Sequence, residues 1–222
     1  MFASDARDAA TRALAANDPV LARVINRVGR CSLEPDHETD LFQALLRSII
    51  FQQLHGRAAE AIHGRVVALM PTLTAATLQG LPDAPLRAAG LSANKLLALR
   101  DLAARTVDGT IPPPGMAADL SDDTLMERLT QVRGVGPWTV QVLMIFYLGR
   151  LDVLPATDFG IRKAFSLLYR RGRPVKPESI LRHAKRRQPY RSVASWYLWR
   201  SLDSAPPIED QAPSPKSRRA AL

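Results

Sequence analysis

The chain is poor in features that cross-link a protein or anchor it in a membrane. Cys31 is the only cysteine among 222 residues, which excludes a disulfide framework and is typical of a reducing compartment. The apolar run from Val142 to Leu148 is far shorter than the ~20 residues of a membrane helix. Asp5 and Asp8 stand where the apolar core of a signal peptide would lie. We therefore expect a cytoplasmic protein that does not enter a membrane.

Period-two alternation of apolar and polar residues, which marks a half-buried β-strand, is also missing. Apolar residues instead recur at helical spacing, and 17 prolines and 12 glycines punctuate the pattern. The spacing predicts an all-α fold with helices over residues 4–15, 18–28, 38–52, 56–70, 74–79, 84–89, 94–107, 122–132, 137–148, 158–170, 177–187 and 191–203.

Cofactor motifs are absent as well. The chain has neither a phosphate-binding P-loop nor a G-x-G-x-x-G turn after a strand, so we expect no organic cofactor. His37, His63 and His183 form no i, i+4 pair and have no cysteine partner, which argues against a zinc site.

Positive charge, by contrast, is abundant and concentrated. The net charge is +9, and residues 162–200 carry twelve Lys or Arg against one acid, Glu178, so this basic region holds the whole excess. Its positive field attracts polyanions and makes their binding sensitive to salt. The alternative is a solvated helix face with a basic loop. An anionic membrane fits less well, because no strongly apolar face accompanies the charge.

A glycine-rich turn precedes the basic region. Gly134, Val135 and Gly136 follow an amphipathic segment, and Pro137 suits the first turn of another helix. The pattern predicts two helices joined by a hairpin. Backbone N–H groups at the start of the second helix suit a phosphate oxygen, which they would bind without reading any base. Many helix pairs use such a turn for packing alone, so the glycines by themselves leave both interpretations open.

Four segments of the chain occur in the order found in one known family. They are residues 42–59 with the pair Gln52-Gln53, residues 90–95 (GLSANK), residues 132–158 from VRGVGPWT to an Asp after a Pro-containing loop, and residues 190–200 (YRSVASWYLWR). Together they resemble the helix-hairpin-helix-GPD superfamily of DNA glycosylases over about residues 37–202.

The resemblance implies a bilobal all-α fold with a DNA-binding cleft between the lobes. One lobe would comprise about residues 40–140, and the other residues 1–39 together with 141–203. Residues 204–222 are rich in Pro, Ser and charge and are expected to form a disordered tail.

Two differences from other branches of the family narrow the resemblance. Members that also nick the strand carry a Lys in place of Trp138 and form a Schiff base with the sugar. Other branches carry four cysteines for an iron–sulfur cluster, which this chain lacks. The sequence is therefore most similar to the 3-methyladenine DNA glycosylase II type, in a compact form without the β-rich N-terminal domain of longer members. The resemblance implies a monomeric, monofunctional base excision repair enzyme that acts on double-stranded DNA with alkylated bases, in a bacterial nucleoid or a eukaryotic nucleus.

Asp158 is the candidate catalytic residue. Cleavage of a nucleoside C1′–N bond gives the sugar oxocarbenium character, which a nearby anion stabilises. An Asp at a helix start is also an ordinary N-cap, and the two roles are compatible. The nearby Asp152 precedes apolar residues, and the resemblance places it outside the pocket. Because 3-methyladenine or 7-methylguanine in DNA already carries positive charge, it leaves without a second carboxyl group as acid.

Recognition of such a base is expected to rest on aromatic rings, since a cation over an aromatic face gains ~0.5–2 kcal/mol. The resemblance places Trp138 and Trp199 in the base pocket, with Phe51 and Phe159 as neighbours. For Phe159 the residues alone favour a position in the core. Val142 stands where a longer relative has a pocket tyrosine.

The remaining contacts implied by the resemblance involve DNA and a cation. Gln53 would fill the hole left by a flipped base and His55 would touch the opened backbone, with Leu91 as an alternative wedge. The predicted DNA-binding residues near the hairpin are Arg133, Gly134, Val135, Gly136, Thr139 and Lys163. The main-chain carbonyls of Gln131, Arg133 and Val135 would hold a structural Na⁺ or K⁺.

Two other functions remain compatible with parts of this pattern. A non-catalytic helix-hairpin-helix module would keep the glycines and the basic region but would have no need of Asp158. A strand-nicking lyase would need an amine in the cleft, for which Lys95 and Lys163 are the nearby candidates.

Overall fold

The computed structural model describes residues 4–36, 39–113 and 115–203, and within these ranges the chain contains helices and no strand. The predicted all-α class is therefore confirmed. The predicted tail, residues 204–222, lies outside the described residues. The α-helices are α1 (Ser4–Asn17), α2 (Pro19–Val28), α3 (Leu41–Phe51), α4 (Gly56–Ala68), α5 (Ala75–Gly80), α6 (Asp83–Ala88), α7 (Ala93–Val107), α8 (Asp122–Leu129), α9 (Pro137–Phe146), α10 (Phe159–Arg170), α11 (Pro177–His183) and α12 (Arg191–Asp203), with 3-10 helices at Met116–Ala118 and Ala184–Arg187.

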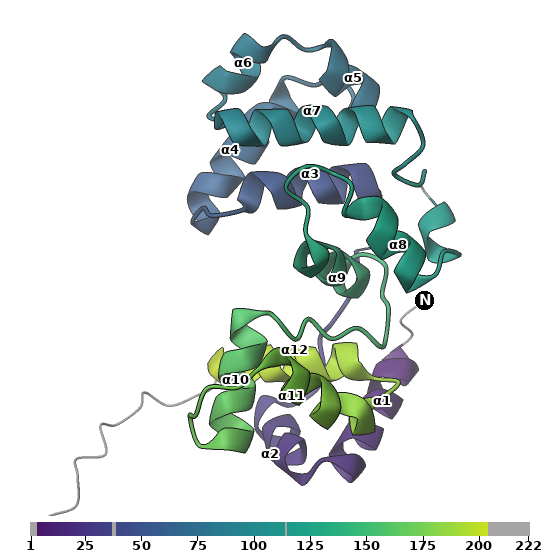
Figure 1. Ribbon diagram of the computed structural model, residues 1–222, viewed down its shortest axis with the longest axis vertical. Coiled ribbons are helices and arrows are strands. Elements are labelled where there is room, and N and C mark those ends of the chain that lie inside the picture. The colour runs from purple at the N-terminus through teal and green to yellow at the C-terminus, as the bar shows by residue number, and fades with distance from the viewer. Residues whose placement is uncertain (1–3, 37–38, 114, 204–222) are drawn as a thin grey trace, which may run out of the picture.

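The helices pack in two groups (Figure 1). In one group α3 packs against α4 and α7, and α7 also contacts α5 and α6. In the other group α12 packs against α1, α2 and α10. Helix α9 packs on α8 and lies between the two groups in Figure 1. The lobe boundaries that the resemblance implies, at residues 40 and 141, stay a prediction.

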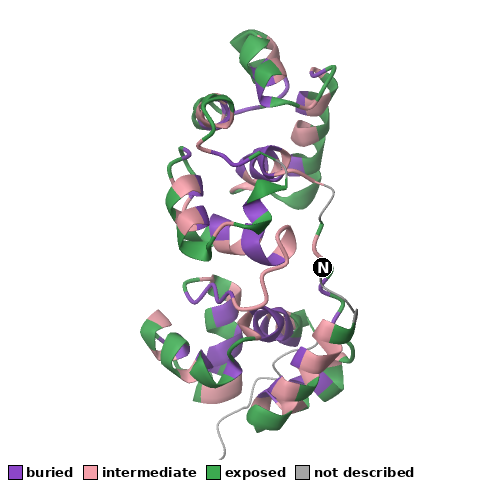
Figure 2. Ribbon diagram, turned by 90° about the vertical axis from the view of Figure 1, so that its right-hand side faces the viewer, coloured by how far each residue is buried: buried purple, intermediate pink, exposed green. Residues whose placement is uncertain are grey.

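Helix α12 is the centre of the second group. Its residues 192–198 are all buried, and Figure 2 shows buried positions on the faces that helices turn toward one another. The buried hydroxyl of Ser195 donates to the Arg191 carbonyl one turn earlier at 2.8 Å, so this polar group is satisfied within the helix. Trp199 follows this buried stretch and is held against α10.

Side-chain caps fix where many of the helices begin. In each case the carboxylate or hydroxyl accepts a hydrogen bond from a backbone N–H in the first turn, which satisfies a donor that the helix leaves free. The capping residues are Asp18, Asp40, Thr74, Ser92, Ser121 and Asp158.

A buried ionic cluster ties part of the basic region to the first helices. Oδ2 of Asp18 accepts hydrogen bonds from Nε and Nη2 of Arg187 at 3.1 and 2.9 Å and from the Tyr169 hydroxyl at 2.9 Å. Burial alone raises the pKa of Asp18, but the hydrogen bond from Leu21 and the charge of Arg187 outweigh it, so the pKa is lowered overall. This arginine is therefore structural.

Most predicted boundaries differ from the structure by one to four residues, and three of these differences have a local cause. Helix α8 ends at Leu129 rather than 132, because the Val132 carbonyl already accepts the Val135 N–H of the hairpin at 3.0 Å. Helix α9 ends at Phe146, just before the turn at Gly149, whose φ is 65°. The predicted helix over 177–187 tightens to 3-10 geometry at Ala184–Arg187. None of the helices in the described ranges has the length and apolarity needed to cross a bilayer.

Candidate active site

Asp158 is held by three hydrogen bonds at the N-terminus of α10. Its Oδ1 accepts the Ile161 N–H at 2.8 Å, the bond of a helix N-cap, and the Trp199 indole N–H at 2.8 Å. Its Oδ2 accepts the Trp138 indole N–H at 2.9 Å. A carboxylate oxygen has about two lone pairs, so Oδ1 is fully engaged and Oδ2 keeps one acceptor site free.

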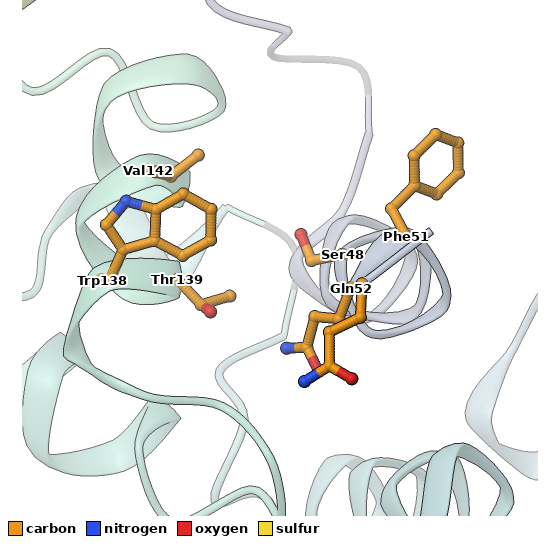
Figure 3. Close-up of a pocket in the computed structure, with 7 residues that line it drawn as sticks. Ser48, Phe51, Gln52, Trp138, Thr139 and Val142 are labelled. Carbon is orange, nitrogen blue, oxygen red and sulfur yellow. The ribbon is translucent and has the colours of Figure 1, made fainter. Parts of the chain in front are cut away.

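A cavity of about 470 Å³ is lined by Trp138, whose indole N–H binds this carboxylate; Asp158 itself does not line it. Figure 3 shows Trp138, Thr139 and Val142 of α9 on one side and Ser48 and Gln52 of α3 and its end on the other. The Trp138 side chain therefore belongs both to the cavity wall and to the hydrogen bond with Asp158. The other lining residues are Phe51 and Gln53.

The other aromatic residues predicted for the base pocket, Phe51, Trp199 and Phe159, have different surroundings. The Phe51 ring packs under the guanidinium of Arg47, whose Cζ is 4.1 Å from the ring centroid, and points away from Trp138 in Figure 3. The Trp199 ring leans on Phe146, with centroids 5.7 Å apart, and reaches Asp158 rather than the cavity wall. Phe159 is 77% exposed, so it is not a core residue.

Asp152 is committed to another partner. Its two carboxylate oxygens accept hydrogen bonds from Nε and Nη2 of Arg191 at 2.7 and 2.9 Å, and Oδ1 also accepts the Arg191 N–H. This arrangement fixes the start of α12, whereas Asp158 is linked to the cavity through Trp138.

The hairpin presents several unused backbone donors. Gly134 has a φ of +79°, a conformation that favours glycine. In the described part of the chain, no protein acceptor meets the N–H groups of Gly134, Gly136 and Thr139. The N–H groups of the other two hairpin residues predicted to bind DNA have protein acceptors. Val135 donates to the Val132 carbonyl, and Arg133 donates to Oδ2 of Asp101 at 2.7 Å. The side chain of Arg133 is exposed.

The carbonyls of the same hairpin alternate between used and free. Those of Val132, Gly134 and Gly136 accept hydrogen bonds from Val135, from the Gln52 amide and from Val140. The predicted cation ligands are the alternate carbonyls of Gln131, Arg133 and Val135, and these accept no hydrogen bond from a described residue. Free carbonyl oxygens of this kind are the donor set that a hard monovalent cation requires. No cluster of three or more His, Cys, Asp or Glu that could hold a metal occurs in ranges 4–36, 39–113 and 115–203.

The turn after α3 is strained at the predicted wedge. Gln53 has a φ of +58°, unusual for a residue with a side chain, and it is exposed, as is His55 at the start of α4. Such strain concentrates at functional sites. Leu91 is only 2% exposed, so the alternative that it serves as wedge is wrong: its side chain is part of the core. Leu54, 39% exposed, is the apolar side chain beside Gln53.

Comparison with known proteins shows the family of the chain. The profile of the HhH-GPD superfamily of base excision DNA repair proteins matches residues 46–189. DNA-3-methyladenine glycosylase 1 of Schizosaccharomyces pombe is 38% identical over 163 residues, which cover 72% of this chain and 72% of that protein. The chain belongs to the HhH-GPD superfamily.

Two solved structures share the fold. The 3-methyladenine DNA glycosylase of S. pombe, in complex with abasic DNA, superposes with a TM-score of 0.76 at 34% identity, over 87% of this chain and 96% of that one. A DNA-3-methyladenine glycosidase from Bacillus halodurans gives a TM-score of 0.78 at 32% identity, over 86% and 88% of the two chains.

Sequence reasoning did not foresee the contacts of three residues that shape this HhH-GPD site. Gly160 lies against Trp199, and a Cβ there would stand 2.9 Å from the indole Cδ1. The Gln52 amide donates to the Gly134 carbonyl at 3.0 Å and joins the wedge turn to the hairpin. Asp101 holds the Arg133 N–H. Only Gly160 gave a signal in the sequence, because a glycine inside a helix lowers helix stability and so indicates a special role. The contacts of Gln52 and Asp101 join segments that are far apart in the sequence.

Proposed function

We propose that the protein is a monofunctional DNA-3-methyladenine glycosylase. It flips 3-methyladenine, 7-methylguanine and related alkylated purines out of double-stranded DNA and hydrolyses their N-glycosidic bond. The observation that carries the proposal is the carboxylate of Asp158, which two indole N–H groups hold, one of them from Trp138 in the cavity wall. The relatives named above are 3-methyladenine glycosylases, which supports the same substrate class.

The free acceptor site of Asp158 Oδ2 suits the reaction. As the C1′–N bond lengthens, positive charge grows on the sugar, and a fixed anion stabilises that charge more than it stabilises the ground state. The same oxygen can accept a proton from the water that adds to C1′. The leaving purine carries its own positive charge and departs as a neutral base, so the single free carboxylate is sufficient.

Trp138 couples base recognition to this chemistry. The indole wall of the cavity offers a π-face to a cationic purine, while its N–H is bonded to Oδ2 of Asp158. A base stacked on that wall brings its glycosidic bond toward the carboxylate. The indole has no amine that could form a Schiff base, which supports hydrolysis without strand cleavage.

The two amines that a lyase would require are poorly suited. The Lys95 ammonium donates to the Ile50 carbonyl near the end of α3, so it is bound to the protein backbone and stabilises the turn that carries Gln53. Lys163 is exposed on α10, more than a turn beyond Asp158.

DNA contacts follow from the same geometry. The free N–H groups of Gly134, Gly136 and Thr139 would bind a backbone phosphate, aided by the helix dipole of α9 and by the side chains of Arg133 and Lys163. Na⁺ or K⁺ on the free hairpin carbonyls would add positive charge there. Gln53 would fill the gap left by the flipped base, with His55 on the opened strand. Such a protein works as a monomer in a compartment that contains DNA.

Release of free base from methylated duplex DNA, followed by alkali treatment, tests the proposal. The expected result is free 3-methyladenine and 7-methylguanine, with strands that break only after alkali. Strand breaks before alkali would identify a lyase instead. Tight DNA binding without base release would identify a non-catalytic module, and Asp158→Asn serves as the inactive control for either assay.

A further inference from the structure

Some arginines of the basic region form ion pairs within the protein and others do not. Arg187 and Arg191 pair with Asp18 and Asp152. In contrast, Arg170, Arg173 and Arg182 are exposed, and none of the three forms an ion pair with a described residue.

These three arginines, of which Arg182 donates a hydrogen bond to the Ser179 hydroxyl, line two adjoining cavities at the C-terminal end of α10. The first, about 410 Å³, lies between α10 and α11 and is lined by Phe165, Tyr169, Arg170, Ser179, Arg182 and His183. The second, also about 410 Å³, shares Tyr169 and Arg170 and adds Arg171 and Arg173. No acidic side chain lines either cavity, so both suit an anion.

Charged side chains that contact Tyr169 and His183 reinforce this preference for an anion. Arg186 and Arg187 both approach Oδ2 of Asp18, at 3.7 and 2.9 Å, so two guanidinium groups share one carboxylate. These groups contact Tyr169 and His183 of the cavity lining and together carry an excess positive charge. Burial is the largest cause of the lowered pKa of His183, about 4, and the charges of Arg187 and Arg186 add to it.

One face of α10 connects these cavities to the catalytic carboxylate. Phe159, Lys163, Leu167 and Arg170 are all exposed, and at about 100° per residue they fall within roughly 80° of the helix circumference. The stripe begins beside Asp158 and, at ~1.5 Å per residue, ends ~18 Å away. Figure 1 shows α10 on the outer edge of its helix group.

We propose that the cavities at the C-terminal end of α10 bind a backbone phosphate of the duplex about five nucleotides from the lesion. That distance follows from ~18 Å of helix and ~3.4 Å per nucleotide of one strand. The inference rests on the proposed function, since it takes the lesion to lie at Asp158. The contact holds flanking duplex, carries no base specificity and extends the footprint beyond the hairpin.

The test compares Arg170→Ala/Arg173→Ala/Arg182→Ala with the control Arg12→Ala/Arg23→Ala/Arg27→Ala. Both variants lose three exposed arginines, but the control changes lie on α1 and α2. Affinity is measured against salt concentration on duplexes of about 9 and about 25 base pairs, each with a central uncleavable abasic-site analogue. On the long duplex the slope of log affinity against log salt should shrink by ~0.9, with ~10-fold weaker binding near 50 mM salt. On the short duplex the slope for the Arg170, Arg173 and Arg182 variant should match that of the wild type.

Three outcomes would overturn the inference: equal loss on both duplexes, no difference from the control variant, or binding of inorganic phosphate to the cavities without any length effect. The wild type's excision of 3-methyladenine from the short duplex is measured in parallel. Excision without a length effect rejects only the flanking contact, whereas absence of excision rejects the proposed function.

Discussion

The Trp199 indole donates a 2.8 Å hydrogen bond to Oδ1 of Asp158, across 41 residues of sequence. This bond joins the buried helix α12 to the N-terminus of α10. Because Oδ1 also accepts the Ile161 N–H, the carboxylate is fixed by its own helix and by a second one. Its orientation is thus set by packing before any substrate arrives, the arrangement that electrostatic catalysis requires.

Asp158→Asn should lower single-turnover excision of 3-methyladenine by at least ~100-fold, or about 2.7 kcal/mol. The amide keeps the size of the side chain and its capping oxygen but removes the negative charge that stabilises the oxocarbenium ion. DNA binding should be preserved. Asp123→Asn, another acid in the first turn of a helix, is the matched control and should excise normally. Activity of Asp158→Asn within a few-fold of wild type would remove the carboxylate from the mechanism.

Gly160→Ala should slow excision by about 10-fold with little change in the melting temperature. The added Cβ would lie 2.9 Å from Cδ1 of Trp199 and 3.1 Å from Oδ1 of Asp158, so the indole must move away from the carboxylate. Gly64→Ala is the control, because a Cβ at this exposed position in α4 meets nothing within 4 Å and should stabilise the helix by ~0.5–1 kcal/mol. If Gly160→Ala and Gly64→Ala excise equally well, the Trp199 bond does not position Asp158.

Gly136→Asp should weaken binding to all DNA sequences alike, by about 10-fold or more, because it sets a negative charge where a phosphate would bind. Gly136 has ordinary extended φ and ψ values of −102° and 173°, and a Cβ there meets nothing within 4 Å. Gly136→Ala is therefore expected to fold and to bind nearly normally, which separates charge from bulk. Normal binding by a folded Gly136→Asp protein would make the hairpin purely structural.

Trp138→Ala should reduce excision of cationic purines at least ~10-fold, because it removes both a stacking face and a donor to Asp158. Trp138→Phe keeps a ring without the N–H and should fall between alanine and wild type. The wild type should excise 3-methyladenine and 7-methylguanine faster than neutral hypoxanthine, since it depends on an activated leaving group. Single-turnover rates on matched duplexes decide this; faster release of hypoxanthine would overturn the substrate class and leave the glycosylase chemistry intact.

The sequence was sufficient for the fold class and for a candidate list, because both depend on local signals. Helical periodicity, capping residues and the Gly134–Pro137 turn act within a few residues of one another. The hydrogen bonds from Trp138 and Trp199 to Asp158 could not be foreseen, since they depend on how α9, α10 and α12 pack.

Local sequence signals also do not show which charged or apolar side chains are buried. Nothing local distinguishes Arg187, which is 1% exposed beside Asp18, from the exposed Arg170 in the same basic region. The pairing partner of Arg187 lies 169 residues away. Burial of Leu91 likewise depends on the packing of the helices around it, so its exclusion as a wedge needed the three-dimensional structure.

The stability of the fold should depend on the protonation of His183. Burial and the charges of Arg187 and Arg186 lower the pKa of His183 to about 4 in the folded chain, against ~6.5 in the unfolded chain. The unfolded chain therefore binds this proton more tightly. The contribution of the neutral ring to the free energy of unfolding is complete above pH ~6.5 and is lost as the pH falls from ~6.5 to about 4. It should amount to about 2 kcal/mol, since the 25% exposed ring is partly screened by solvent.

His183→Phe tests this dependence directly. Phenylalanine keeps the edge contacts with Phe165 and Tyr169, whose ring centroids lie 4.9 and 4.5 Å from the imidazole, but it cannot take up a proton. Urea unfolding at about pH 7 and pH 4.5 should show a stability loss that is smaller in this variant than in wild type by about 2 kcal/mol. His55→Asn, at the exposed start of α4, is the control and should lose as much stability as wild type. If His183→Phe and wild type lose stability in parallel, the imidazole is not the group that titrates.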